Sequence, residues 1–123
     1  MSDEKAELKF DERGLIPVVA YDIDTKEVLM LAWADARAVE LTLSTEYAHY
    51  FSRSRRQIWK KGESSGMLQR VHRVLVDCDN DTLMYEVSQK GGACHMGYRS
   101  CFYRTLDGEQ VSRKVFEPGE VYR

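Results

Sequence analysis

The first part of the chain contains two short apolar runs separated by polar residues. Residues 15–21 read LIPVVAY and residues 28–33 read VLMLAW, and both runs have the composition of strands. Residues 22–26 between them supply the aspartates, threonine and lysine of a turn. This pattern predicts a β-hairpin.

One helix is predicted directly after the hairpin. Asp35 is a suitable N-cap, and Ala36, Val39 and Leu43 follow at spacings that place them on one helical face. The helix is expected to end near Ser44.

The rest of the chain contains strand-like segments bounded by glycine, aspartate and asparagine. They are residues 47–51, 67–76, 82–87, 100–105 and 111–116. Strands without intervening helices favour an antiparallel sheet or barrel. The predicted fold class is therefore mostly β (α+β), with one main covering helix.

Composition and charge are those of an ordinary globular protein. The 123 residues are 43% hydrophobic and 31% charged, which fits one domain over residues 1–123. A net charge of −2 gives no overall attraction to nucleic acid. The charged start lacks the apolar core of a secretory signal, and no run is long enough to span a membrane. We expect a cytoplasmic protein with neither a nucleic-acid nor a membrane partner.

The three cysteines, Cys78, Cys94 and Cys101, cannot all pair within one chain. In a reducing compartment they are buried thiols or metal ligands. Cys94 and Cys101 lie in GGACHMGYRSCFYR, whose glycines permit a tight backbone path. Three thiolates with one open position would form a catalytic zinc site. His95 would then either complete a structural site or act as a general base.

Acidic residues alternate in the segment DCDND. In an extended chain, Asp77, Asp79 and Asp81 face one side and Cys78 faces the other. Carboxylate oxygens suit magnesium or calcium and a thiolate suits zinc, so two metals could be served. An acidic hairpin turn without a metal is the alternative.

A basic segment, SRSRRQIWKKGESSG, covers residues 52–66. Arginine side chains and backbone amides next to glycine suit phosphate oxygens, and the face of Trp59 suits stacking on a base. A solvated charged hairpin is the alternative. Neither the P-loop pattern nor GxGxxG occurs in the sequence, so a nucleotide site of those two kinds is unsupported.

Together, the SRSR…W.KGE.SG, DCDND and GGACH…G.RSCF blocks resemble phosphoribosyl-AMP cyclohydrolase of histidine biosynthesis. The resemblance extends from about Leu15 to Tyr103, with fifteen residues between Cys78 and Cys94 and six between Cys94 and Cys101. It implies an intertwined homodimer of open, barrel-like antiparallel or mixed sheets. Some relatives are fused to a pyrophosphohydrolase domain, but because this chain ends at Arg123 we expect it to lack one.

The resemblance implies two metal ions and a phosphorylated substrate. Cys78, Cys94 and Cys101 would bind Zn²⁺, with Cys78 supplied across the dimer interface. Mg²⁺ would be bound by Asp77, Asp79 and Asp81. The residues expected to bind phosphoribosyl-AMP are Ser52, Arg53, Arg55, Trp59, Lys61, Glu63, Ser65 and Arg99.

The implied reaction is hydrolysis of the N1–C6 bond of the substrate's purine ring, which gives a formimino aminoimidazole carboxamide ribotide. His95 is the expected catalytic base, because Met67 and Tyr98 stand where relatives often carry histidine. A zinc-stabilised RNA-binding module, in which His95 is the fourth ligand, is the competing hypothesis. A nucleoside deaminase is disfavoured because the H-x-E…P-C-x-x-C signature is absent.

Overall fold

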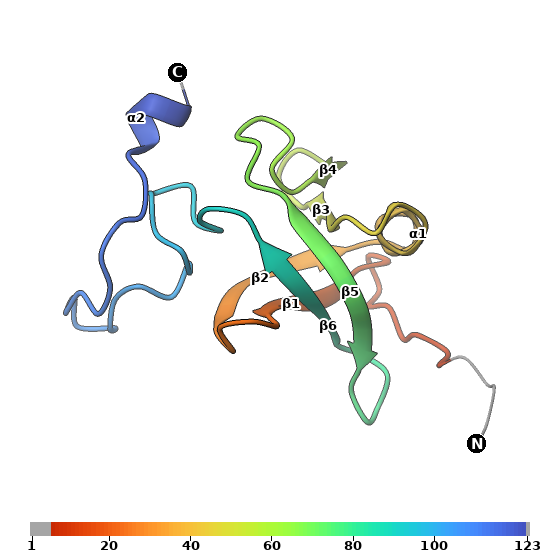
Figure 1. Ribbon diagram of the computed structural model, residues 1–123. Helices are drawn as coiled ribbons and strands as arrows, with labels where there is room; N and C mark the ends of the chain where they lie inside the picture. The colour runs from red at the N-terminus through yellow and green to blue at the C-terminus, as the bar shows by residue number, and fades with distance from the viewer. Residues whose placement is uncertain (1–5, 123) are drawn as a thin grey trace.

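The computed structural model describes residues 6–122, which form a four-stranded sheet, a two-stranded sheet and two helices (Figure 1). The predicted domain of residues 1–123 and the charged start of the chain both include residues that lie outside this range. Neither helix in the described range is long and apolar enough to cross a membrane.

The four-stranded sheet consists of two hairpins joined side by side. Its order is β2–β1–β6–β5. The bounds are Ile16–Asp22 for β1, Val28–Ala34 for β2, Gln69–Val76 for β5 and Leu83–Gln89 for β6. Each hairpin is antiparallel, whereas β1 and β6 pair in parallel at the centre. The predicted first hairpin is confirmed, and the sheet is mixed and, over residues 6–122, does not close into a barrel.

Helix α1 (Ala36–Thr45) begins where the sequence predicts it. The Asp35 carboxylate accepts a hydrogen bond from the Ala38 amide at 2.8 Å, and this interaction caps the first turn. The buried face includes Val39 and Thr42, whereas Leu43 is 63% exposed. Val39 is buried as predicted, but the predictions for Ala36 and Leu43 are wrong, because the buried face is formed by Ala38, Val39 and Thr42.

The second sheet is a hairpin of β3 (His49–Ser52) and β4 (Gln57–Lys60). The sequence did not predict β4, because its residues are part of the basic segment. Tyr50 of β3 is fully buried, and its ring centroid lies 5.0 Å from that of Trp59 in β4. Burial of Tyr50 against the core therefore positions Trp59.

The predicted strands at residues 100–105 and 111–116 are wrong. In the described range, single bridges join Tyr98 to Lys114 and Arg104 to Gln110, and no ladder forms. Phe102 is 61% exposed and Val111 is 60% exposed, so these two apolar side chains are not buried within the chain. A short second helix, α2 (Pro118–Val121), follows this region.

Candidate functional site

Cys94 and Cys101 meet in the loop that follows β6. The Cys94 amide donates to the Tyr98 carbonyl at 3.0 Å, and the Cys101 amide donates to the carbonyl of Leu29 in β2 at 2.7 Å. The turn between them needs Gly97, whose φ is +102° and whose added Cβ would lie 2.5 Å from a backbone oxygen. The two thiols lie close enough for Cys94 to influence the ionisation of Cys101.

The Cys101 thiol resists ionisation in this position. Although the residue is exposed, desolvation of its thiol and the nearby Cys94 thiol raise the pKa of Cys101 to about 11. The ammonium of Lys61 acts in the opposite direction. Without a metal, Cys101 is therefore a protonated thiol at neutral pH.

Cys78 lies at the opposite end of β6, in the turn between β5 and β6 (Figure 1). Strand β6 has seven residues, and at roughly 3.3 Å per residue it separates this turn from the following loop by roughly 20 Å. Within residues 6–122, the three thiols accordingly do not gather into one group. A single chain brings together two of the three predicted zinc ligands.

The carboxylates of Asp77, Asp79 and Asp81 converge in the β5–β6 turn. One oxygen of each lies within 4.8 Å of the others, and all three residues are exposed. Asp77 accepts hydrogen bonds from the backbone amides of Asp81 at 3.0 Å and Thr82 at 3.2 Å. The segment is thus an acidic turn, and its carboxylates also lie close enough to share a cation.

Because these carboxylates lie close together, the pKa of one is lowered and the pKa of another is raised. Partial desolvation works against ionisation of Asp77, but hydrogen bonds from the Asp81 backbone and side chain hold its pKa below the usual value. Hydrogen bonds with the Asp81 and Asp77 carboxyls raise the pKa of Asp79. A divalent cation bound between the three carboxylates would offset the repulsion between their negative charges.

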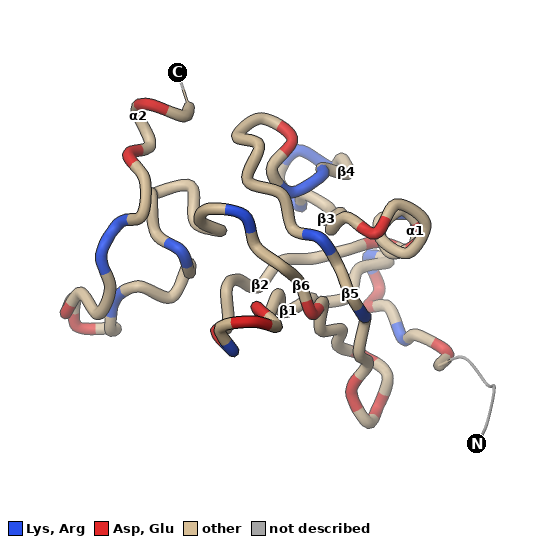
Figure 2. Tube along the Cα trace, viewed as in Figure 1, with Lys and Arg blue, Asp and Glu red and all other residues tan. Residues whose placement is uncertain are grey.

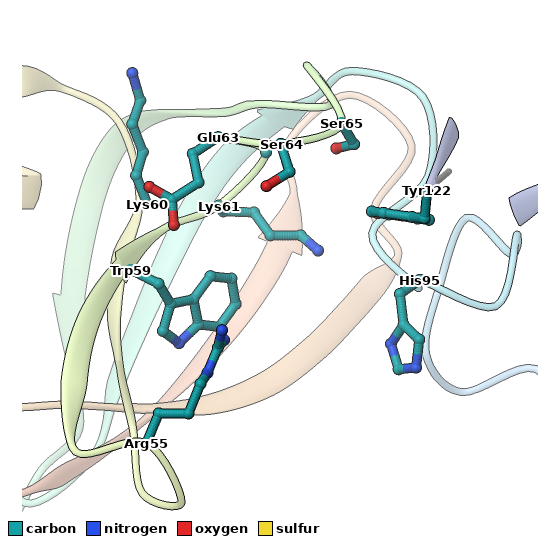
Figure 3. Close-up of a pocket in the computed structure, with 10 residues that line it drawn as sticks. Arg55, Trp59, Lys60, Lys61, Glu63, Ser64, Ser65, His95 and Tyr122 are labelled. Atoms are coloured by element: carbon teal, nitrogen blue, oxygen red, sulfur yellow. The ribbon is translucent and has the colours of Figure 1, made fainter. Parts of the chain in front are cut away.

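A cavity of about 310 Å³ lies next to the loop after β6 that carries Cys94 and Cys101, called the cysteine loop below (Figure 3). Five of the predicted substrate-binding residues and His95 line it, with contributions from β4, the two flanking loops and the C-terminal end. The lining residues are Arg55, Trp59, Lys60, Lys61, Gly62, Glu63, Ser64, Ser65, His95 and Tyr122. Figure 3 shows Trp59 and His95 on opposite walls, with Lys61 extending between them.

Lys61 connects this cavity to the cysteine pair. Its ammonium donates a hydrogen bond to the carbonyl of Ala93, the residue before Cys94. Desolvation lowers the pKa of Lys61, while negative charge on Cys101 and Cys94 would raise it. Ionised thiols would therefore keep Lys61 charged.

A second cavity of about 560 Å³ contains the other two predicted substrate-binding residues of the basic segment. Ser52 and Arg53 line it, together with Arg13 and Trp33. No motif in the sequence predicted a role for Arg13, Trp33 or Tyr122. Trp33 ends an apolar run and Arg13 lies before the first predicted strand, so neither stands in a recognisable motif.

Arg99 lies in neither of these two cavities. Its guanidinium pairs with Asp22, whose side chain is 1% exposed, and with Glu27 at 3.2 Å. It also donates to the Gly91 carbonyl at 2.8 Å. Arg99 thereby ties the cysteine loop to the β1–β2 hairpin, and its contact with substrate stays a prediction.

Met67 and Tyr98 fill space around the loop. Tyr98 is 7% exposed and stacks on Tyr103 with ring centroids 3.7 Å apart. The sulfur of Met67 lies 2.8 Å from where a Cβ on Gly91 would be. Both side chains pack the loop that carries Cys94.

Comparison with known proteins gives a consistent result. A family model described as phosphoribosyl-AMP cyclohydrolase matches residues 30–103. Proteins of that name from Methanospirillum hungatei and Methanoregula boonei are 61% and 63% identical, and each match covers 94% of this chain and 88% and 94% of the relative. A third, from Archaeoglobus fulgidus, is 61% identical over 85% of this chain and 97% of its own length.

Proposed function

Since the chain belongs to the phosphoribosyl-AMP cyclohydrolase family, we propose that it hydrolyses the N1–C6 bond of phosphoribosyl-AMP in a zinc-dependent reaction. The chain is a hydrolase that acts on a cyclic amidine in histidine biosynthesis. The observation that carries the finer proposal is the cavity lined by His95 and Trp59 beside the Cys94–Cys101 pair.

Zinc would be held by Cys94 and Cys101 of one chain and Cys78 of a second. The soft, adjacent thiols fit this metal better than magnesium. One strand length separates Cys78 from the other two, so a single chain cannot place all three on one ion. The exposed side chains of Phe102 and Val111 offer apolar surface that a second copy would bury.

The chain's own residues would bind the substrate and move the proton. A thiolate-bound zinc would supply a nucleophile by lowering the pKa of its water. Trp59 would stack on the purine and orient its reacting carbon 6. His95 would accept a proton as water adds to that carbon and deliver it to nitrogen 1 as the C6–N1 bond breaks. The single ring-opened product carries both a carboxamide and a formimino arm.

A magnesium ion held by Asp77, Asp79 and Asp81 is the second part of the proposal. Three convergent, exposed carboxylates suit a hard cation that retains several waters. If Cys78 serves zinc in a partner's site, the magnesium would lie next to that site and would offset substrate phosphate charge.

His95→Ala tests the catalytic assignment. We expect turnover of phosphoribosyl-AMP to fall about a hundredfold, because proton transfer loses its positioned base. Zinc content should stay at the wild-type level. The measurements are a spectroscopic ring-opening assay and metal analysis on the same preparation.

Loss of zinc in His95→Ala would contradict the base assignment and would support a fourth-ligand role. His72→Ala is the matched control, because His72 is exposed and its ring lies 2.7 Å from Ser88 on the sheet. Turnover in that control should stay near wild type. Wild-type protein that turns over fully without metal would refute the zinc proposal as a whole.

Zinc affinity is expected to rise with pH. The pKa of Cys101 is raised to about 11, so at neutral pH its thiol carries a proton that zinc must displace. Since pH 6.5 to 7.5 lies below this pKa, apparent affinity should increase at least about tenfold across that interval. Competition with a chelator, corrected for the chelator's own protonation, measures it.

The same titration with magnesium provides the comparison. Magnesium affinity should change much less, because carboxylates lose their protons at lower pH than thiols. A zinc affinity independent of pH would mean that thiolates are not the ligands. A cytoplasmic location remains part of the proposal.

A further inference from the structure

Three cavities lie in a row along the β3–β4 hairpin. The cavity that contains His95 shares Arg55 and Trp59 with the second cavity. The second shares Arg13 and Arg53 with a third of about 740 Å³. The row thus leads from the proposed reaction centre to the segment that precedes β1.

The third cavity is strongly basic. Arg13, Arg53 and Arg56 line it, with Glu12 as the one acidic residue among its lining residues. Within residues 6–122, none of these three arginines forms an ion pair. Figure 2 shows basic residues gathered at the β3–β4 hairpin. The cluster therefore has uncompensated positive charge available for an anion.

A tight turn holds Arg13 in place. The Asp11 carboxylate accepts hydrogen bonds from the amides of Arg13 and Leu15, both at 2.9 Å. Leu15 is 4% exposed and anchors the turn in the core, while Gly14 adopts a φ of +77°. The backbone carrying Arg13 is thus ordered before a ligand arrives.

The β3–β4 turn and Trp33 position the other two arginines. The Ser52 carbonyl accepts from the Arg56 amide at 2.8 Å, which closes the four-residue turn. The guanidinium of Arg53 lies 4.8 Å from the centroid of the Trp33 ring. Stacking on an indole fixes the plane of a guanidinium and leaves its N–H groups free for an anion.

We propose that Arg13, Arg53 and Arg56 form a binding site for one of the two phosphate groups of the substrate. This inference rests on the proposed function, since a substrate with phosphates on both sides of the reacting ring needs two separate anion sites. Lys60, with Ser64 and Ser65, lines the cavity nearer to His95 and would meet the other phosphate. Three guanidinium groups match the oxygens of a phosphate monoester.

Arg13→Gln tests the site in a steady-state assay with phosphoribosyl-AMP. KM should rise about tenfold, a larger change than in kcat, because the lost contact serves binding. Arg56→Gln should act in the same direction and covers the case in which Arg13→Gln folds poorly. Arg37→Gln removes the same charge from an exposed residue of α1 and should leave KM unchanged.

Two substrate analogues identify which phosphate is bound. One lacks the phosphate of the adenosine side, and the other lacks the phosphate of the ribose on nitrogen 1. The analogue without the bound phosphate should show the same KM in wild type and Arg13→Gln, whereas the other should retain the tenfold difference. Either assignment supports the site.

A direct binding measurement tests the anion site independently of the proposed reaction. Ribose 5-phosphate can be titrated against tryptophan fluorescence, since Trp33 lies under Arg53. The ribose 5-phosphate concentration at the midpoint should rise severalfold in Arg13→Gln and stay unchanged in Arg37→Gln. This result supports the anion site even if the wild-type protein fails to open phosphoribosyl-AMP. Equal midpoints, or equal KM values in the two variants, would overturn it.

Discussion

Mixing Cys78→Ser chains with Cys94→Ser chains is expected to restore about a quarter of wild-type turnover. Each variant alone should fall below about a thousandth, because every zinc site lacks a thiolate. In the proposed dimer, Cys78 of one chain would meet an intact Cys94–Cys101 pair on the other, so a mixed dimer would have one complete site of two. Random exchange makes half of the dimers mixed.

The matched control is a mixture of Cys94→Ser and Cys101→Ser chains. Because these two thiols belong to the same loop of one chain, every site in every dimer stays broken. Subunits would be exchanged by unfolding and refolding, and turnover and zinc content measured together. Recovery in both mixtures, or in neither, would exclude a site shared in this way.

Arg99→Gln is expected to destabilise the fold by about 3–5 kcal/mol. The substitution leaves the Asp22 carboxylate, 1% exposed, without its cationic partner. The amides of Asp24 and Thr25 satisfy only one of its oxygens. Urea unfolding at fixed protein concentration measures the loss, and zinc affinity should fall because the loop carrying Cys94 is released.

The double variant Asp22→Asn/Arg99→Gln controls for the origin of this loss. It removes both charges, so we expect it to recover a large part of the lost stability. Were Arg99→Gln to raise KM without changing the urea midpoint, the residue would be a substrate ligand, as the sequence pattern predicted. A tenfold loss of zinc affinity at unchanged stability would indicate a role confined to the loop.

The sequence predicted correctly those elements that depend on residues close together in the chain. The β1–β2 hairpin and the Asp35 cap depend on alternation and turn chemistry within a few residues. The parallel pairing of β1 with β6 depends on packing between distant segments and has no local signal. Residues 100–105 and 111–116 were predicted as strands because apolar residues occur there, yet this region forms only isolated bridges, and Phe102 and Val111 are exposed.

Sequence motifs predicted residues that line the cavity around His95, but not Arg13 in the third cavity. Trp59, Lys61 and His95 stand in recognisable blocks and line one cavity together. Arg13 belongs to no motif, and only the fold places it beside Arg53. The sequence also could not indicate that the Arg99 guanidinium is occupied by Asp22, since a buried aspartate at the end of a strand resembles an ordinary turn residue.

The parallel contact at the centre of the sheet has a consequence for the order of folding. Val18 pairs with Leu83, so the contact cannot form on the ribosome until more than half of the chain has been made. Until then, the completed β1–β2 hairpin exposes one edge of β1. Closing so long a loop slows folding, and the cysteine loop after β6 takes its final shape only after this step.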